Sequence, residues 1–333
     1  MTLLTFAACV VVFALAMYVL LDGFDLGVGS LLLTTDIEAE RDEMIESIEP
    51  VWDGNETWLI LLGVTLLAAF PLAYSTLLTA FYLPIMVMLL ALGFRGVSFE
   101  FRGRATVNRR YWDYTFCAGS VVATLCQGLV LGAVLEGTPA HIVSANAGEV
   151  SGEVPIFSLY SCWAAISTVV AYAMIGSAWL NWRTKGATQQ RAASQMRVAM
   201  LAFAVMVVIG IVWTLYTNSK AGQVWYENLV LSIVFAGLAI ILWLASWVAV
   251  RNKPGSARFY SMVLVLLLLV GIVVTVWPYI VPYSISISDA ASPSGSQQFL
   301  MTGVAIILPV VLGNAFFVYR TFRRNKPIKA EKE

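Results

Sequence analysis

The sequence contains few of the side chains that hold metals and redox groups. It has one histidine, His141, and four cysteines, Cys9, Cys117, Cys126 and Cys162, with no CxxC pair among them. Haem iron is usually bound by histidine, and copper or zinc by clusters of imidazole and thiolate groups. We therefore expect His141 to be a solvated loop residue and the cysteines to act as small apolar residues in helix packing. The chain is expected to bind no metal through its own ligands.

The sequence also lacks the short motifs that accompany phosphate binding and nucleophilic catalysis. It contains no GxxxxGK[ST], no GxGxxG after a strand, no GxSxG and no HExxH. Its formal net charge is zero, which gives no indication of a nucleic-acid partner. Any redox or hydrolytic chemistry in which this chain takes part is therefore expected to be supplied by a partner.

Long apolar runs are what the sequence has in abundance. Hydrophobic residues make up 59% of it and charged residues only 12%, and the apolar residues form blocks long enough to span a bilayer. This predicts an all-α polytopic membrane protein with a single transmembrane domain over residues 1–333, whose first span is retained because no cleavage site follows it. The nine predicted spans cover residues 3–30, 56–73, 76–97, 114–135, 156–181, 197–216, 227–250, 259–281 and 298–320.

The basic residues predict how this chain is oriented in the membrane. With nine spans, 19 of the 20 lysines and arginines fall on one side and only Lys220 falls on the other. Short cytoplasmic loops retain positive charge, so this side is predicted to be the cytoplasm. The amino terminus is then outside, and the carboxyl terminus, with a basic tail at 321–333, is cytoplasmic.

Two carboxylates lie inside the first predicted span, in the segment LDGFDLGVGS. Asp22 and Asp25 are three residues apart and share one helix face, while Gly23 and Gly27 form a GxxxG step that allows close approach of another helix. Ionisable residues within lipid are costly and mark candidate functional sites. Arg95, at the end of the third span, is the expected cation. A proton-handling role is one interpretation, and an ion pair that only clamps two helices is the other.

A second polar group is WDGNETW, at the cytoplasmic start of the second span. Asp53 and Glu56 have the spacing of a capping box, which would explain both without any mechanism. Trp52 and Trp58 fit an interfacial aromatic belt as readily as the wall of a quinone site. We therefore expect Glu56, Trp52 and Trp58 to be structural residues, and we keep Asp53 as a candidate proton acceptor.

Two further acidic segments lie on the predicted cytoplasmic side. In FRGVSFEFRGR, Glu100 stands among Arg95, Arg102 and Arg104, an arrangement that is usually a solvated salt-bridge cluster. Residues 36–49 contain seven acids and one arginine. The apolar residues of this segment recur at helical spacing, which predicts a helix lying in the cytoplasmic interface; they are Ile37, Met44, Ile45 and Ile48.

Together these motifs resemble subunit II of the cytochrome bd-type quinol oxidases. GFDLGVG, WDGNETW, FRGVSFEFR and the proline-aromatic segment WPYIVPYSIS carry the resemblance, which extends over essentially the whole chain and is strongest to the cyanide-insensitive branch. It implies nine helices arranged as two four-helix bundles plus one peripheral helix, in a bacterial inner membrane. It also implies a partner, subunit I, with two haem b and one haem d, which oxidises quinol on the outer side and reduces dioxygen to water with cytoplasmic protons.

The same resemblance implies what this subunit contributes. Subunit II of the family holds no haem, supports haem assembly in subunit I, provides a cytoplasmic proton route and in some cases binds a quinone; small single-helix subunits can accompany it. Carried over to this sequence, the route involves Asp22, Asp25, Asp53, Glu100 and Arg95. A proton-coupled secondary transporter is the alternative function, because buried carboxylates beside glycines also form cation sites in such proteins.

Overall fold

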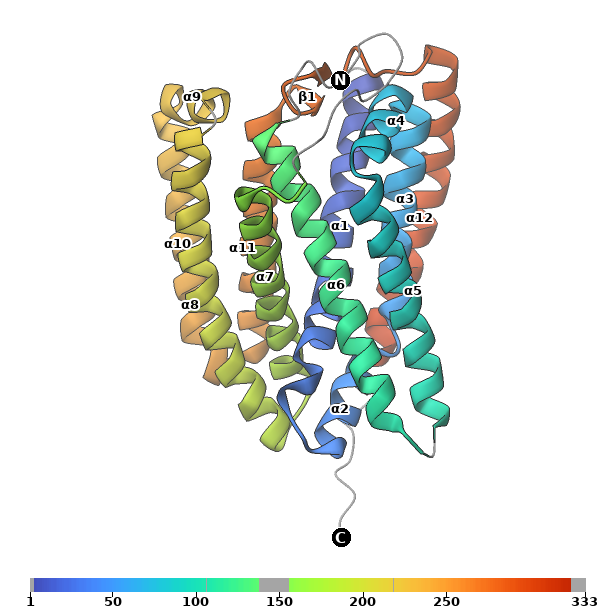
Figure 1. The fold of residues 1–333 in the computed structure, drawn as a ribbon, viewed down its shortest axis with the longest axis vertical. Helices are drawn as coiled ribbons and strands as arrows, with labels where there is room; N and C mark the ends of the chain where they lie inside the picture. The colour runs from blue at the N-terminus through green and yellow to red at the C-terminus, as the bar shows by residue number, and fades with distance from the viewer. Residues whose placement is uncertain (1–2, 106, 138–155, 218, 325–333) are drawn as a thin grey trace.

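The protein is a bundle of helices that run side by side along its long axis (Figure 1). The computed structural model describes residues 3–105, 107–137, 156–217 and 219–324. Within these ranges eight helices are long and apolar enough to cross a membrane. A helix satisfies its own backbone hydrogen bonds, which hydrocarbon cannot do, so long apolar runs fold as helices. The prediction of an all-α, multi-pass membrane protein is confirmed.

The eight helices are α1 (Leu3–Leu31), α5 (Tyr82–Arg104), α6 (Arg109–Glu136), α7 (Leu159–Arg183), α8 (Gly186–Thr217), α10 (Leu229–Asn252), α11 (Pro254–Val276) and α12 (Ser294–Arg324). The shorter elements are a 3-10 turn η1 (Leu32–Thr34), α2 (Glu38–Ile48), α3 (Trp52–Ala69), α4 (Pro71–Ala80), α9 (Ser219–Glu227), β1 (Tyr279–Val281) and β2 (Ile285–Ser286). The two short strands pair antiparallel and form the only sheet within the described ranges.

The predicted second and third spans, 56–73 and 76–97, are divided differently in the structure. α3 begins at Trp52 and ends at Ala69, and α4 starts at Pro71, where the missing backbone N–H of proline fits the first helical position. α5 then follows without a loop. α3 is not among the eight apolar helices, and its first two turns, WDGNETW, are largely polar.

The predicted eighth span, 259–281, ends earlier than expected. α11 stops at Val276, just before Pro278, and the chain then forms the β1–β2 hairpin. Val281 and Ile285 of this hairpin are buried against the start of α1. The hairpin and α4 lie at the end of the molecule where α1 begins (Figure 1).

The helices form two groups with α1 near the centre. α1 packs against α3, α6 and α7, α5 packs against α6, and α12 contacts α3 and α1. The second group contains α7, α8, α10 and α11. α8, α9 and α10 form one edge of the molecule, and α2 lies at the end opposite α4 (Figure 1). α1, which carries both buried aspartates, is therefore enclosed by helices of both groups.

Close approach of α1 and α7 depends on two glycines. A Cβ added to Gly27 would lie 1.9 Å from the backbone oxygen of Tyr172, and one added to Gly176 would lie 2.5 Å from the carbonyl carbon of Gly27. These are backbone contacts that no side-chain movement relieves. Small residues allow this kind of helix contact within lipid. The predicted close approach at the GxxxG step of α1 is confirmed at Gly27.

Candidate functional site: a buried charge cluster

The centre of the candidate site is formed by the last third of α1. Asp22 and Asp25 are completely inaccessible to solvent. They are three residues apart, so their side chains lie on the same face of α1. This face is turned toward the interior of the bundle. Burying an ionised carboxylate is strongly unfavourable unless a cation and hydrogen-bond donors compensate it. The groups around each aspartate therefore decide what it can do.

Arg95 of α5 is the cation beside Asp22. Its Nη1 lies 3.0 Å from Asp22 Oδ1 and 3.5 Å from Glu56 Oε1 of α3. The guanidinium also lies over the ring of Phe116, 5.7 Å from its centroid. Only 1% of the Arg95 side chain is exposed, whereas 27% of Glu56 is exposed. The predicted pairing of Asp22 with Arg95 is confirmed, although Arg95 lies within α5 and not at its end.

Asp25 has neutral partners instead. Asn55 of α3 donates from Nδ2 to Asp25 Oδ2 at 2.7 Å, and Tyr319 of α12 donates its hydroxyl to Asn55 Oδ1 at 3.0 Å. Asn55 is 2% exposed. These two hydrogen bonds join α1, α3 and α12 at one point. No arginine or lysine forms a hydrogen bond or ion pair with Asp25 within the described residues.

A second polar chain lies on the other side of Asp22. Tyr172 of α7 donates its hydroxyl to Gln127 Oε1 of α6 at 2.8 Å, and Gln127 Nε2 donates to the Tyr18 hydroxyl at 2.8 Å. Tyr18 precedes Asp22 by four residues and so lies on the same face of α1. This chain links α6 and α7 to α1 next to the Asp22–Arg95 pair.

Several buried polar atoms of the cluster have no protein partner. Within the described part of the chain, Asp22 Oδ2, Asp25 Oδ1, and Nε and Nη2 of Arg95 accept or donate no hydrogen bond. Buried polar atoms that lack a protein partner are the places where proteins hold ordered water. The cluster therefore combines ionisable groups with sites that can hold water. Proton transfer requires both.

A second buried ion network holds α2 against the bundle. Arg41 Nε lies 2.8 Å from Asp113 Oδ2, Arg102 Nε pairs with Asp113 Oδ1, and Arg102 Nη2 lies 2.8 Å from Asp42 Oδ1. Asp113 is completely buried between its two arginines. Two cations on one carboxylate compensate its burial, so this network fixes α2 to the ends of α5 and α6.

The outer face of α2 is acidic. Partial burial raises the pKa of Glu46, and the nearby carboxylates of Asp42, Glu49 and Glu43 raise it further. Met44, Ile45 and Ile48 are buried, whereas Ile37, which was assigned to the same apolar face, is 53% exposed because it precedes the first helical residue. α2 thus caps one end of the bundle with its apolar side and presents carboxylates on the other.

Glu100 and Asp53 lie on the surface and outside the buried cluster. The Glu100 side chain is 64% exposed and pairs only with Arg104, at 3.5 Å, in the described residues. The buried face of α5 is formed by Arg95, Ser98, Phe99 and Arg102. Glu100 is five residues beyond Arg95 and therefore points away from this face. Asp53 is exposed near the start of α3.

The capping role predicted for Glu56 is wrong, and Trp58 is not part of an interfacial aromatic belt. The N-cap of α3 is Val51, and no side chain caps it, so Asp53 and Glu56 do not form a capping box. Trp58 is 2% exposed and packs edge-on against Phe13 at 5.8 Å between ring centroids, so it is a core residue. Trp52 stacks on Phe99 at 5.1 Å.

Several members of the two networks were not identified from the sequence, among them Asn55, Asp113 and Tyr319. Asn55 stands inside the WDGNETW motif, but a neutral amide carries no charge signal. Asp113 immediately precedes the predicted span 114–135, so it does not stand out as a charge within an apolar run. Tyr319 is 264 positions from Asn55, so nothing in the local sequence connects the two.

The cysteines add no metal site within the described residues. All four cysteines are free. Within the described residues no group of three or more histidine, cysteine, aspartate and glutamate side chains could hold a metal ion. His141 and most of the basic tail, 325–333, lie outside the described residues.

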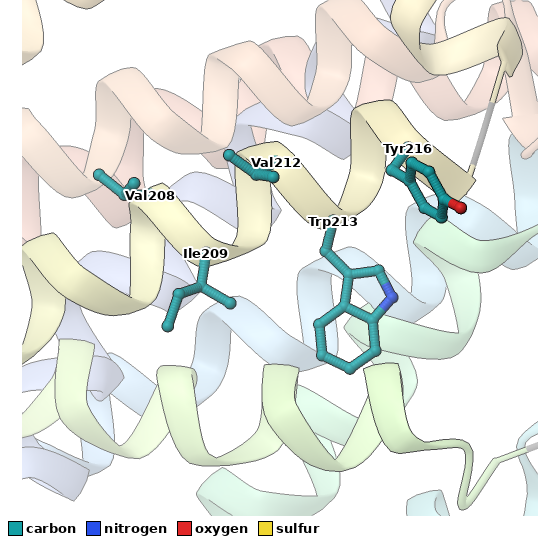
Figure 2. A pocket seen from close by; sticks show the side chains of 5 residues that line it. All are labelled: Val208, Ile209, Val212, Trp213 and Tyr216. Atoms are coloured by element: carbon teal, nitrogen blue, oxygen red, sulfur yellow. The ribbon is translucent and has the colours of Figure 1, made fainter.

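An apolar hollow of about 390 Å³ lies along α8, separate from the charged cluster. Figure 2 shows Trp213 turned from α8 toward the neighbouring helix, where its ring lies 6.2 Å from that of Trp163 of α7. The lining residues are Val208, Ile209, Val212, Trp213 and Tyr216. None of them is charged, so the hollow contributes nothing to the polar chemistry of the cluster.

Comparison with known proteins gives one consistent result. The profile of the family described as "Cytochrome bd terminal oxidase subunit II" matches residues 3–322. "Cytochrome bd ubiquinol oxidase subunit 2" of Bacillus subtilis is 27% identical over 321 residues, which cover 91% of each chain. "Cytochrome bd-I ubiquinol oxidase subunit 2" of Escherichia coli K12 is 28% identical over 331 residues, covering 87% of this chain and 86% of the relative.

A solved structure shares the fold. A chain of "The structure of bd oxidase from Geobacillus thermodenitrificans" superposes with a TM-score of 0.78 at 17% identity, covering 98% of this chain and all of that one. At this identity the likeness establishes the arrangement of helices, and the sequence comparisons carry the assignment of a family.

Proposed function

The chain belongs to the cytochrome bd terminal oxidase subunit II family and is a subunit of a bd-type quinol oxidase; on that premise we propose that it conducts cytoplasmic protons to the subunit that reduces dioxygen. The observation that carries the proposal is the completely buried Asp22–Arg95 and Asp25–Asn55 cluster. A membrane subunit gains nothing in stability from a second buried carboxylate without a cation, so its presence points to function.

Membership of the family implies haem in the complex and a partner, subunit I. The donor set of this chain does not fit an axially bound haem, since it has one histidine, His141, and its four free thiols are spread over α1, α6 and α7. We propose that two haem b and one haem d are held by subunit I, which oxidises quinol. A bound quinone and small single-helix subunits, which the resemblance implies for some members of the family, are a separate part of the proposal.

We propose that the chain crosses the bacterial inner membrane nine times, with α3 as the crossing that is not counted among the eight apolar helices. α1, α3, α5 and α6 then form one four-helix bundle, α7, α8, α10 and α11 form the other, and α12 is peripheral. Arginine-rich segments gather at the α2 end, which the positive-inside rule assigns to the cytoplasm. The amino terminus is then outside, and α2 lies in the cytoplasmic interface.

In this orientation the acids divide into a surface set and a buried set. Asp53, Glu100 and the acidic face of α2 are exposed to the cytoplasm and collect protons. Asp22, Asp25 and Arg95 form the buried part of the route. Acid–base groups that are linked by water can pass protons from the surface set to the buried set. The transporter alternative has no support in the family assignment.

Gentle purification of the tagged chain tests the assignment of the haems. We expect the chain to co-purify with a second subunit and with the visible spectrum of haem, because this subunit supports haem assembly in its partner. The same preparation should oxidise quinol with consumption of oxygen. A colourless, stable preparation that lacks a second subunit would contradict the proposed role in the complex.

A further inference from the structure

A small cavity adjoins the cluster at the α2 end. It has a volume of about 20 Å³, is partly open to the outside of the molecule, and is lined by the turn between α2 and α3, by Trp179, Trp182 and Arg183 of α7, and by Tyr319. About 10–15 Å³ is enough to hold one water molecule. Tyr319 and Trp179 both line this space. The buried Nε1 of Trp179 has no protein partner among the described residues, and the Tyr319 hydroxyl donates to Asn55, the partner of Asp25.

The charges around the two aspartates are unequal. The charged groups that act on Asp25 are Arg95 of α5, Asp22 of its own helix and Glu56 of α3, and Arg258 of α11 acts on Tyr319. Three carboxyl groups thus share the single guanidinium of Arg95 within the described cluster. In a poorly solvated site such a set does not ionise completely, so at least one carboxyl keeps its proton.

The geometry identifies which carboxyl this is. Asp22 receives a charge-assisted hydrogen bond from Arg95 at 3.0 Å, which favours its ionised form. Asp25 receives a bond only from the neutral amide of Asn55, and its Oδ1 has no partner within the described residues. Glu56 is 27% exposed and lies 3.5 Å from Arg95 Nη1, so both the cation and solvent compensate its charge in part. Asp25 is the group whose charge would be least compensated.

We propose that Asp25 is the carboxyl that holds a proton at rest, and that it exchanges this proton with the cytoplasm through Tyr319 and the cavity beside it. The proposal rests on the proton-conducting function proposed above and names the path within it. Asp22 is then a fixed anion that keeps Arg95 in place. Asn55 of α3 is a positioning residue, because its side chain hydrogen-bonds both Tyr319 and Asp25 and so fixes their relative position.

The transfer balances when water replaces the Asn55 amide. An amide relays protons poorly, so we place the exchange in an arrangement in which Asn55 has turned aside and water lies between Tyr319 and ionised Asp25. This water donates one proton to Asp25 and takes one from the Tyr319 hydroxyl, which takes one from water in the cavity. Asp25 gains one proton, the cytoplasmic side loses one, and the other groups are unchanged.

Infrared difference spectroscopy of the purified oxidase tests the resting proton. The spectrum of the wild type minus that of Asp25→Asn should contain the C=O stretch of a carboxylic acid that shifts in D₂O. The corresponding spectrum, wild type minus Glu56→Gln, should lack this band. Glu56→Gln changes the other carboxyl beside Arg95. A carboxylic acid band that persists in Asp25→Asn, or that is lost only in Glu56→Gln, would overturn the assignment.

The rate of the D₂O shift tests the path. Tyr319→Phe removes only the hydroxyl and should slow deuteration of the Asp25 band by about tenfold, the effect of losing one buried hydrogen-bonding group. Tyr160→Phe is the matched control, because it removes the same atom from a buried tyrosine whose hydroxyl bonds Thr214 and not the cluster, and its exchange rate should equal that of the wild type. Equal rates in Tyr319→Phe and the wild type would overturn the path.

The proton-conducting function and the path through Tyr319 can be disproved independently of each other. If Asp25→Asn consumed oxygen at the wild-type rate, the proton-conducting function would be wrong, whatever the infrared spectrum shows. If turnover fell but Tyr319→Phe exchanged deuterium normally, the function would stand and only the path through Tyr319 would be wrong.

Discussion

Replacing Asp25 with asparagine is expected to slow oxygen consumption by the assembled oxidase at least about 100-fold, the contribution that positioned general acids and bases make to proton transfer. Asparagine has nearly the same shape and keeps a hydrogen bond to Asn55, but it cannot take up a proton. The haem spectrum should be unchanged, because the bundle remains packed. Oxygen uptake with saturating quinol, normalised to haem, measures the effect.

Asp36→Asn is the matched control for this experiment. Asp36 is 90% exposed at the same end of the molecule and forms a surface ion pair with Arg110. The same chemical change at this position should leave turnover within about twofold of the wild type, since exposed ion pairs contribute little. Loss of haem in Asp25→Asn would indicate a structural role, and wild-type turnover would remove Asp25 from the route.

Replacing Arg95 is expected to damage the subunit itself. Arg95→Gln leaves Asp22 buried without its cation, and breaking a buried pair in this way costs about 3–5 kcal/mol. We expect little assembled oxidase in the membrane and a strongly lowered melting temperature. The double variant Asp22→Asn with Arg95→Gln should recover part of this loss, because it removes the fully buried carboxylate that Arg95 pairs and leaves only the partly exposed Glu56 without its cation.

Arg104→Gln provides the comparison for Arg95. Arg104 is 84% exposed and pairs with Glu100 at the surface, so its loss should change stability by less than about 0.5 kcal/mol. Haem content per membrane protein and the thermal midpoint of the solubilised complex measure both variants. Equal stability of Arg95→Gln and Arg104→Gln would show that the buried pair is not structurally important.

The sequence predicts the charged centre of the site well. Charges within an apolar run are rare and costly, so Asp22, Asp25 and Arg95 stand out without any structure. The long apolar runs likewise predict most of the helices. The division of residues 52–104 into three helices is less visible, because the polar start of α3 weakens its apolar signal and only one residue, Phe81, separates α4 from α5.

The remainder depends on helix register and on contacts between distant segments. Glu100 was grouped with Arg95 because the two are close in sequence, but five residues along a helix turn the side chain to another face. Asn55 and Tyr319 are neutral, so no charge marks them in the sequence. They become important only because the fold buries them. Trp58 resembles a membrane-interface residue until the packing of α1 on α3 places it in the core.

The most direct test of the central claim is proton uptake by oxidase reconstituted in vesicles with the α2 end facing the trapped solution. During oxygen reduction the wild type should make the trapped solution alkaline. Asp25→Asn should do so at least about 100-fold more slowly, while its haems are reduced by quinol at the wild-type rate. Proton uptake by Asp25→Asn at the wild-type rate would contradict the account.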